Sequence, residues 1–271
     1  MRKLAIAVAV LMSAGPVTTA AQAATGILAT HRAVYDLSLK SASERSGISG
    51  MAGRMVYEFN GSACDGYTVS FRFVTQVLTG NESRLTDQQT TTFEDVRDRT
   101  FRFVTRSFVD ETLDRETRGS ARAQDGGLSI ALEQPEKTTL NIPDARLPTE
   151  HLLEMIERAQ AGERFYESRL YDGSDGGDTA MITTSILGAE QAPEAGDDEA
   201  AAAGDLSDDR FWPVSMSYFE ENAEGDGLPV YSISFKLYEN GVTRDLTMDY
   251  GDFVLEGELA ALEMFEPEPC E

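Results

Sequence analysis

The stretch YSISFKLYENG, residues 231–241, shows a pattern that runs through most of the chain. Apolar or aromatic side chains occupy every second position from Tyr231 to Leu237, and serine or lysine stands between them. A period of two is typical of a β-strand that buries one face. Asn240-Gly241 then supplies the strongest dipeptide signal for a short hairpin turn. The stretch therefore predicts two antiparallel strands joined near residue 240.

Similar alternating segments recur on both sides of this hairpin. They cover residues 33–39, 55–59, 67–73, 101–103, 128–132, 180–186, 212–218 and 246–250. Turn signals such as Asn60-Gly61 and Asp125-Gly126-Gly127 separate several of them. Because short turns connect neighbouring antiparallel strands, the pattern predicts a mostly β chain built on antiparallel sheet.

One segment has helical rather than strand periodicity. Its apolar residues, spaced as on one helix face, are Leu152, Met155, Ile156 and Ala159. With Thr149 as N-cap and Gly162 as the stop, we expect a helix over residues 149–161, the only substantial one. A single helix among many strands favours a strongly curved, barrel-like sheet with the helix packed in it over a two-sheet sandwich.

The N-terminus has the features of a secretory signal peptide. Arg2 and Lys3 precede an apolar run over residues 4–12, and Ala21-Gln22-Ala23 offers a small-residue cleavage site. We expect cleavage after Ala23, which leaves a single domain over residues 24–271. A retained membrane anchor is disfavoured because a spanning helix needs about 20 apolar residues. No later segment reaches that length, so we expect no transmembrane segment after cleavage.

The chain has two cysteines, Cys64 and Cys270. In the oxidising compartment that export implies, a lone pair of cysteines usually forms a disulfide, and we expect a structural one here. Two unpaired thiols are the alternative. A catalytic cysteine is disfavoured because neither residue belongs to a Cys-x-x-Cys motif or has a nearby histidine.

Lys and Arg number 23 against 47 Asp and Glu, which gives a formal net charge of −24. Such an acidic chain is a poor binder of nucleic acids or of anionic membrane surfaces, because both require clustered positive charge. Residues 189–209 contain eight acidic residues and no basic one. We expect this segment to be a disordered, solvated loop inserted in the domain.

Motifs for chemistry are absent from the sequence or weak. We find no phosphate loop, dinucleotide fingerprint or nucleophile elbow, and we expect His31 and His151 at the surface or rim. A Gly-Asp-rich run at 172–178 is better explained as a turn than as a calcium loop. The carboxylates of Asp249, Asp252 and Glu256 invite an acid–base pair, but chance proximity explains them as well. We predict no catalytic residue, metal or cofactor.

Arginines are dense between residues 97 and 122. The seven are Arg97, Arg99, Arg102, Arg106, Arg115, Arg118 and Arg122. Aligned on adjacent strands, they could bind an anionic lipid head group or a glycan carboxylate. Cross-strand pairing with the interspersed Asp95, Asp98, Asp110, Glu111, Asp114 and Glu116 is the favoured alternative.

Large apolar residues on several strands are candidates for a ligand-binding concave face. They are Phe101, Phe103, Trp212, Met216, Phe219, Tyr231 and Phe235. Large concave apolar surfaces in exported proteins often hold acyl chains or apolar peptides. Ordinary core packing is the alternative, and it must account for most of these residues.

Several motifs resemble one known family. They are HRAVYDLSL at 31–39, GRMVYE at 53–58 leading to ACDGY at 63–67, YENG at 238–241, MDYGDF at 248–253 and the terminal cysteine. Together they are similar to the periplasmic envelope-integrity protein B (EipB) family of alphaproteobacteria, over essentially the whole mature chain. The positions of Cys64 and Cys270 are the most specific feature of the resemblance.

The resemblance implies a periplasmic β-spiral with a helix packed in it and a Cys64–Cys270 disulfide. This fold is similar to lipoprotein carriers and to sensor domains that hold apolar ligands. The family is associated with maintenance of the cell envelope and is linked to a periplasmic tetratricopeptide-repeat protein. We therefore expect a non-enzymatic protein that binds a lipid or other apolar ligand, or a protein partner. A scaffold without a small ligand is the alternative, and a cell-wall hydrolase is the third hypothesis.

Overall fold

A computed structural model describes residues 28–266 of the chain, apart from residue 175 and residues 222–226. The expected signal peptide and Cys270 lie outside the described residues. Within the described ranges, no helix is both long and apolar enough to cross a membrane.

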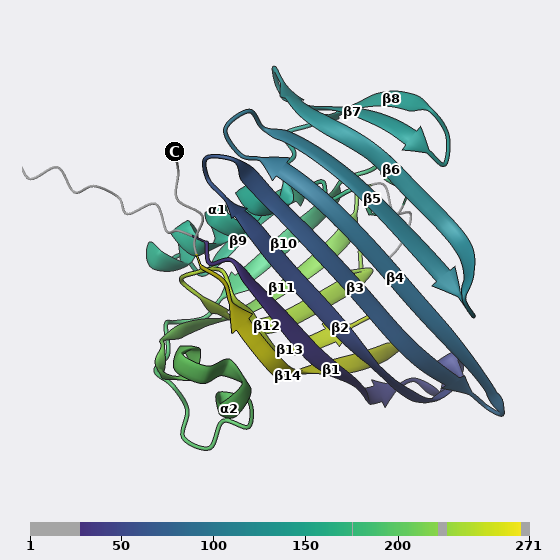
Figure 1. The fold of residues 1–271 in the computed structure, drawn as a ribbon, viewed down its shortest axis with the longest axis vertical. Coiled ribbons are helices and arrows are strands. Elements are labelled where there is room, and N and C mark those ends of the chain that lie inside the picture. The colour runs from purple at the N-terminus through teal and green to yellow at the C-terminus, as the bar shows by residue number, and fades with distance from the viewer. Residues whose placement is uncertain (1–27, 175, 222–226, 267–271) are drawn as a thin grey trace, which may run out of the picture.

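One antiparallel sheet of 14 strands dominates the structure (Figure 1). The strands are β1 His31–Ala42, β2 Ile48–Ser62, β3 Gly66–Thr79, β4 Glu82–Asp95, β5 Thr100–Val109, β6 Thr112–Gln124, β7 Gly127–Gln134, β8 Thr138–Pro143, β9 Phe165–Leu170, β10 Met181–Leu187, β11 Phe211–Glu220, β12 Tyr231–Tyr238, β13 Thr243–Asp249 and β14 Phe253–Met264. Their order in the sheet is β8-β7-β6-β5-β4-β3-β2-β1-β14-β13-β12-β11-β10-β9. The first and last strands therefore pair with each other in the middle of the sheet, and β8 and β9 form its two edges.

The two edges approach each other without forming a continuous ladder. The N–H of Arg146, just after β8, donates to the carbonyl of Arg169 in β9 at 2.7 Å. The N–H of Tyr171 donates in turn to the carbonyl of Arg146 at 2.9 Å. The sheet is thus strongly curved but unclosed, which confirms the predicted mostly β, spiral-like architecture.

The predicted helix is present as α1, Pro148–Gln160, but its N-cap is Leu147 rather than Thr149. Pro148 occupies the first turn, where a missing N–H costs nothing. The N–H of Thr149 donates instead to the carboxylate of Glu94 in β4, at 2.7 Å. Gly162 follows the helix end with φ +77°, as expected for a glycine stop.

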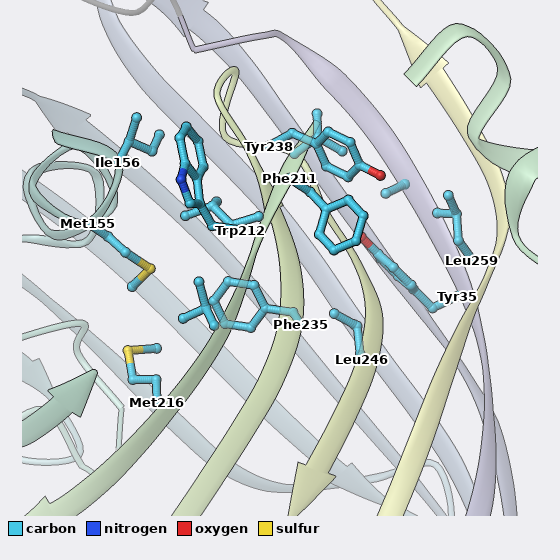
Figure 2. Close-up of a cluster of buried hydrophobic side chains, with 14 of the residues drawn as sticks. Tyr35, Met155, Ile156, Phe211, Trp212, Met216, Phe235, Tyr238, Leu246 and Leu259 are labelled. Atoms are coloured by element: carbon cyan, nitrogen blue, oxygen red, sulfur yellow. The ribbon is translucent and has the colours of Figure 1, made fainter. Parts of the chain in front are cut away.

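The interior of the curved sheet contains two apolar clusters. The larger joins α1 to strands from both halves of the sheet, and Figure 2 shows Met155 and Ile156 of α1 directed toward Trp212 of β11. The smaller lies under β5 to β8 and includes Phe101, Phe103 and Tyr171. Helix α1 therefore fills part of the space that the sheet encloses.

The acidic segment 189–209 is structured, so the expectation of a disordered loop is wrong. It contains a helical turn, α2 Ala200–Ala203, followed by a 3-10 turn at Gly204–Asp208. Glu199 is 6% exposed and accepts the N–H of Leu259 at 2.6 Å. Its carboxylate and that of Asp197 also pair with Arg244 of β13, which is fully buried. A buried guanidinium needs such partners, and they hold the segment on the sheet.

Candidate functional site

The apolar residues expected to share one concave face lie in different places. Phe101 and Phe103 pack edge-on against Tyr171 in the smaller cluster, with ring centroids 6.4 and 5.9 Å from it. Trp212, Met216 and Phe235 are buried in the larger cluster, close to α1 (Figure 2). Tyr231 is partly buried beside that cluster, and Phe219 occupies the alternate face of β11. Most of these residues therefore pack in two separate apolar cores and do not line a shared groove.

A cavity of about 400 Å³ lies elsewhere, against the interior face of β3 to β6. One of its walls is apolar and aromatic, and it consists of Tyr57, Val69 and Phe71. The other is polar, and it consists of Gln88, Thr90, Thr92, Thr105, Ser107, Arg115 and Thr117. Pro148 and part of the segment 172–176 face the sheet and complete the lining. A concave site with an apolar wall and a few polar groups is the usual form of a small-molecule site.

The register of the sheet explains why the walls differ. Phe71 of β3 is paired with Thr90 of β4, Thr90 with Thr105 of β5, and Thr105 with Thr117 of β6. The hydroxyl oxygens of Thr90 and Thr105 are 3.0 Å apart, within hydrogen-bond distance. Along this row the interior side chains change from aromatic to small and hydroxylated. Small side chains leave space between the sheet and the opposite segment, and that space is the cavity.

The segment that covers the cavity is a packed turn. The hydroxyl of Tyr171 is buried and donates to the carbonyl of Gly177 at 2.8 Å. Asp172 accepts the N–H of Ser174 at 2.9 Å, as expected if 172–178 is a turn. A Cβ at Gly173 would lie 2.5 Å from the ring of Phe103, so glycine lets the turn approach the sheet. In the described part of the chain, no group of three or more His, Cys, Asp or Glu could hold a metal ion.

Buried ionisable groups lie close to the cavity. Burial raises the pKa of Glu94 to about 7, although the amides of Thr149 and Glu150 oppose the shift. Burial also raises the pKa of the Tyr57 hydroxyl, and the Glu94 carboxylate adds to the effect. Glu94 thus lies between the start of α1 and the cavity wall, and the pKa of its carboxyl group is near neutral pH.

Only part of the predicted arginine pairing is present. Arg106 and Arg118 both pair with Glu116, at 2.8 and 2.6 Å, and Arg99 pairs with Glu150 of α1. The other acidic residues predicted as partners form no ion pair with these arginines within the described residues. Arg115 makes neither an ion pair nor a side-chain hydrogen bond there, and it lies at the exposed rim of the cavity. The arginines therefore have individual environments rather than forming a ladder.

Both histidines are buried, so their expected surface or rim position is wrong. The Nδ1 atom of His31 is 2.7 Å from the carbonyl of Ala29. His151 of α1 places Nε2 at 3.2 Å from the hydroxyl of Thr183, and burial lowers its pKa to about 4. A neutral imidazole with a hydrogen-bond partner is tolerated in a core. Both side chains therefore belong to the packing of the fold.

The carboxylates near residue 250 have separate partners. Asp249 accepts the N–H of Gly251 at 2.8 Å, and Asp252 accepts the hydroxyl of Ser43 at 3.1 Å. Glu256 pairs with Lys40 at 2.7 Å. No two of these three face each other across a cleft, as an acid–base pair would require.

Cys64 lies in the turn between β2 and β3, where its N–H donates to the hydroxyl of Ser62 at 3.2 Å. The expected partner, Cys270, is outside the described residues. The disulfide therefore stays a prediction.

Comparison with known proteins gives consistent results. A family model described as EipB-like matches residues 22–266. The chain is 49% identical over 258 residues to the cell envelope integrity protein EipB of Brucella abortus strain 2308, covering 95% of this chain and 91% of the relative. A crystal structure of a beta-barrel-like protein of a domain of unknown function, also from Brucella abortus, has a TM-score of 0.85. That structure is 50% identical and covers 88% of this chain and 99% of its own. Neither relative's name refers to an enzymatic activity.

Proposed function

The chain belongs to the EipB-like family, and from this premise we propose that it is a non-enzymatic periplasmic protein that maintains the cell envelope. The name of the Brucella relative supports the envelope role. The basic, apolar and small-residue regions that end at Ala23 support export to the periplasm. The separate partners of Asp249, Asp252 and Glu256 favour this role over the hydrolase hypothesis.

The protein performs this role by holding an apolar ligand, such as a lipid or an acyl chain, in the interior cavity. The observation that carries the proposal is the space itself, because α1 fills the sheet beside Trp212 but leaves about 400 Å³ open over β3 to β6. The apolar wall of the cavity consists of Tyr57, Val69 and Phe71. A hydrocarbon chain that covers this wall removes apolar surface from water, which favours binding by about 25 cal/mol per Å² of surface buried. The cavity, rather than the buried set around Trp212, is the proposed binding surface.

A pair of adjacent substitutions tests the proposal. Thr90→Phe places a large ring in the cavity, whereas Thr91→Phe places the same ring on the opposite face of β4. In a strain lacking its own family member, we expect Thr91→Phe to restore resistance to detergent and Thr90→Phe to fail. Equal thermal midpoints of the two purified proteins would exclude misfolding as the cause. Full rescue by Thr90→Phe would contradict ligand binding in the cavity.

A scaffold that binds a protein partner is the second candidate, and an exposed apolar surface favours it. Phe108, Leu85 and Val74 form the apolar part of an exterior groove of about 270 Å³, and Leu113 is 51% exposed across from Phe108. The rest of the groove is polar and is lined by Arg72, Asp87, Gln89 and Glu111. A periplasmic tetratricopeptide-repeat protein is the proposed partner for this surface. The scaffold role predicts that Leu85→Asp abolishes capture of that protein while Thr90→Phe leaves it intact.

A further inference from the structure

We propose that the cavity selects an anionic, single-chain amphiphile whose head group is bound by Arg115. This inference rests on the proposed function, since it names the ligand class of the same cavity. It depends on the position of Arg115, on its lack of an internal partner, and on the distance between the two walls.

Arg115 reaches the cavity by ordinary strand alternation, because it lies two residues before Thr117 in β6 and faces the same side of the sheet. The register between β5 and β6 shifts after Ser107, which is the partner of Arg115. Ser107 and Thr117, which alternate with exterior-facing neighbours, line the cavity together with Arg115. The guanidinium is therefore set at the rim, next to hydroxyl groups that can donate hydrogen bonds.

The lack of a partner distinguishes Arg115 from its neighbours. Arg106 and Arg118, which flank it on the sheet, share the carboxylate of Glu116. Arg102 and Arg122 also form no ion pair within the described residues, but Arg115 is the arginine that lines the cavity. No acidic side chain neutralises Arg115 within the described residues, so its five donors are available to an anion from outside.

One other charged residue lines the cavity, and it defines where an anion can lie. The carboxylate of Asp172 accepts the N–H of Ser174. Its negative charge also raises the pKa of Tyr218, although burial of Tyr218 is the larger cause. Asp172 would repel an anion placed against the covering turn. The favourable position for an anionic head group is therefore beside Arg115, at the Thr117 end of the row that runs from Phe71 through Thr90 and Thr105.

The spacing of the walls requires an elongated ligand. Phe71 and Thr117 occupy the same row in β3 and β6, three strand spacings apart, which is about 14 Å along the sheet. A ligand that contacts Arg115 and the aromatic wall must separate its charge from its apolar end by a similar length. The volume of 400 Å³ is near the lower end of small-molecule sites, which favours one chain over a two-chain lipid.

Matched fluorescent probes test the inference on the exported protein. Dansyl-undecanoic acid and its methyl ester share one chain and differ in the charge of the head group. At pH 8 we expect the acid to bind about tenfold more tightly than the ester, because its carboxylate can form a charge-assisted hydrogen bond with Arg115. Arg115→Gln should abolish this preference and leave the affinity for the ester unchanged. Arg106→Gln, an exterior arginine on the adjacent strand, should keep the preference.

Competition distinguishes the sources of the anionic group. Dodecanoate and dodecyl phosphate should both displace the acid probe, whereas acetate and inorganic phosphate should not. Displacement by the two chainless anions would overturn the amphiphile inference in favour of a simple anion site. Equal binding of acid and ester, or an unchanged preference in Arg115→Gln, would overturn the role of Arg115 but leave the proposed function intact. Failure of both probes to bind would contradict the proposed function and the inference with it.

Discussion

The backbone N–H of Thr149, in the first turn of α1, donates a 2.7 Å hydrogen bond to the carboxylate of Glu94 in β4. The next amide, that of Glu150, donates to the other oxygen of the same carboxylate at 3.2 Å. Since the first amides of a helix have no partner within it, Glu94 caps α1 from the sheet. The helix that partly fills the interior is thereby anchored at one end of the cavity.

Glu94 should make the stability of the protein depend on pH. Burial raises its pKa from 4.5 to about 7, so the native protein holds a proton that the unfolded chain has lost. The contribution of Glu94 to the free energy of unfolding is present below pH 4.5 and is lost as the pH rises through 7, by about 3 kcal/mol. Glu94→Gln cannot ionise, so its free energy of unfolding in urea should rise relative to that of the wild type by about 2.5 kcal/mol between pH 5 and pH 8.

Glu82→Gln is the matched control, because Glu82 is exposed at the start of the same strand. Its unfolding free energy should differ from that of the wild type by a constant amount at both pH values. A constant difference for Glu94→Gln as well would show that Glu94 is ionised in the native protein throughout this range.

His151 should have the opposite dependence. Burial lowers its pKa from 6.5 to about 4, so the native imidazole stays neutral where the unfolded one is charged. The contribution of His151 to the free energy of unfolding is present above pH 6.5. About 3 kcal/mol of it is lost as the pH falls through 4. His151→Gln, whose amide can still reach Thr183, should remove this loss. Titration of the His151 ring by NMR with a midpoint near 6.5 would contradict the account.

Arg244 should be required for the acidic segment to stay on the sheet. Its side chain is fully buried and pairs with Asp197 at 2.6 Å and with Glu199 at 3.2 Å. Arg244→Met leaves Glu199 without a cation and Asp197 with Lys236 alone, at 3.6 Å, and it should cost about 3–5 kcal/mol of unfolding free energy. We expect limited proteolysis to begin within residues 197–208.

The corresponding control is Arg210→Met, since Arg210 is more than half exposed and pairs with Glu190 at the surface. That change should cost less than about 1 kcal/mol and leave the protease pattern unchanged. Protection of residues 197–208 in Arg244→Met would show that the segment packs without the buried ion pairs.

The predicted disulfide should stabilise the protein. Cys64→Ser should lower the free energy of unfolding under oxidising conditions by up to about 5 kcal/mol, as the chain-entropy model gives for a long loop. The variant and the reduced wild type should then unfold at the same urea concentration. Equal stability of the variant and the oxidised wild type would exclude a structural disulfide.

Strand periodicity predicted nine of the 14 strands and missed β4, β6, β8, β9 and β14. Of these, β4 matters most for the site. In strands such as β12 apolar and polar residues alternate, and burial of one face follows directly. The central part of β4, TDQQTTTFED at 86–95, is polar on both faces, so its position depends on pairing with Phe71 and Phe103 in its neighbours. The cavity was missed for the same reason, because Gln88, Thr90 and Thr92 of this strand form part of its polar wall. Threonine or glutamine at every second position from 86 to 92 was the available signal.

The predictions for the acidic segment and for the two histidines were wrong for a different physical reason. Composition within 189–209 indicates disorder when the segment is considered alone, but Arg244 supplies a buried cation from a distant strand. Likewise, the burial of His151 depends on Thr183 in β10. Such long-range contacts leave no periodic signal near the residues they fix. The apolar ligand candidates were correctly described as hydrophobic, but sequence alone could not assign them to two separate cores.

The central claim is that the interior cavity holds an apolar ligand in the cell. Native mass spectrometry of protein isolated from the periplasm, followed by organic extraction, tests this claim most directly. We predict a bound species carrying an acyl chain in the wild type and in Thr91→Phe, and its loss in Thr90→Phe. Ligand-free protein in all three preparations, or the same bound mass in Thr90→Phe, would contradict the claim.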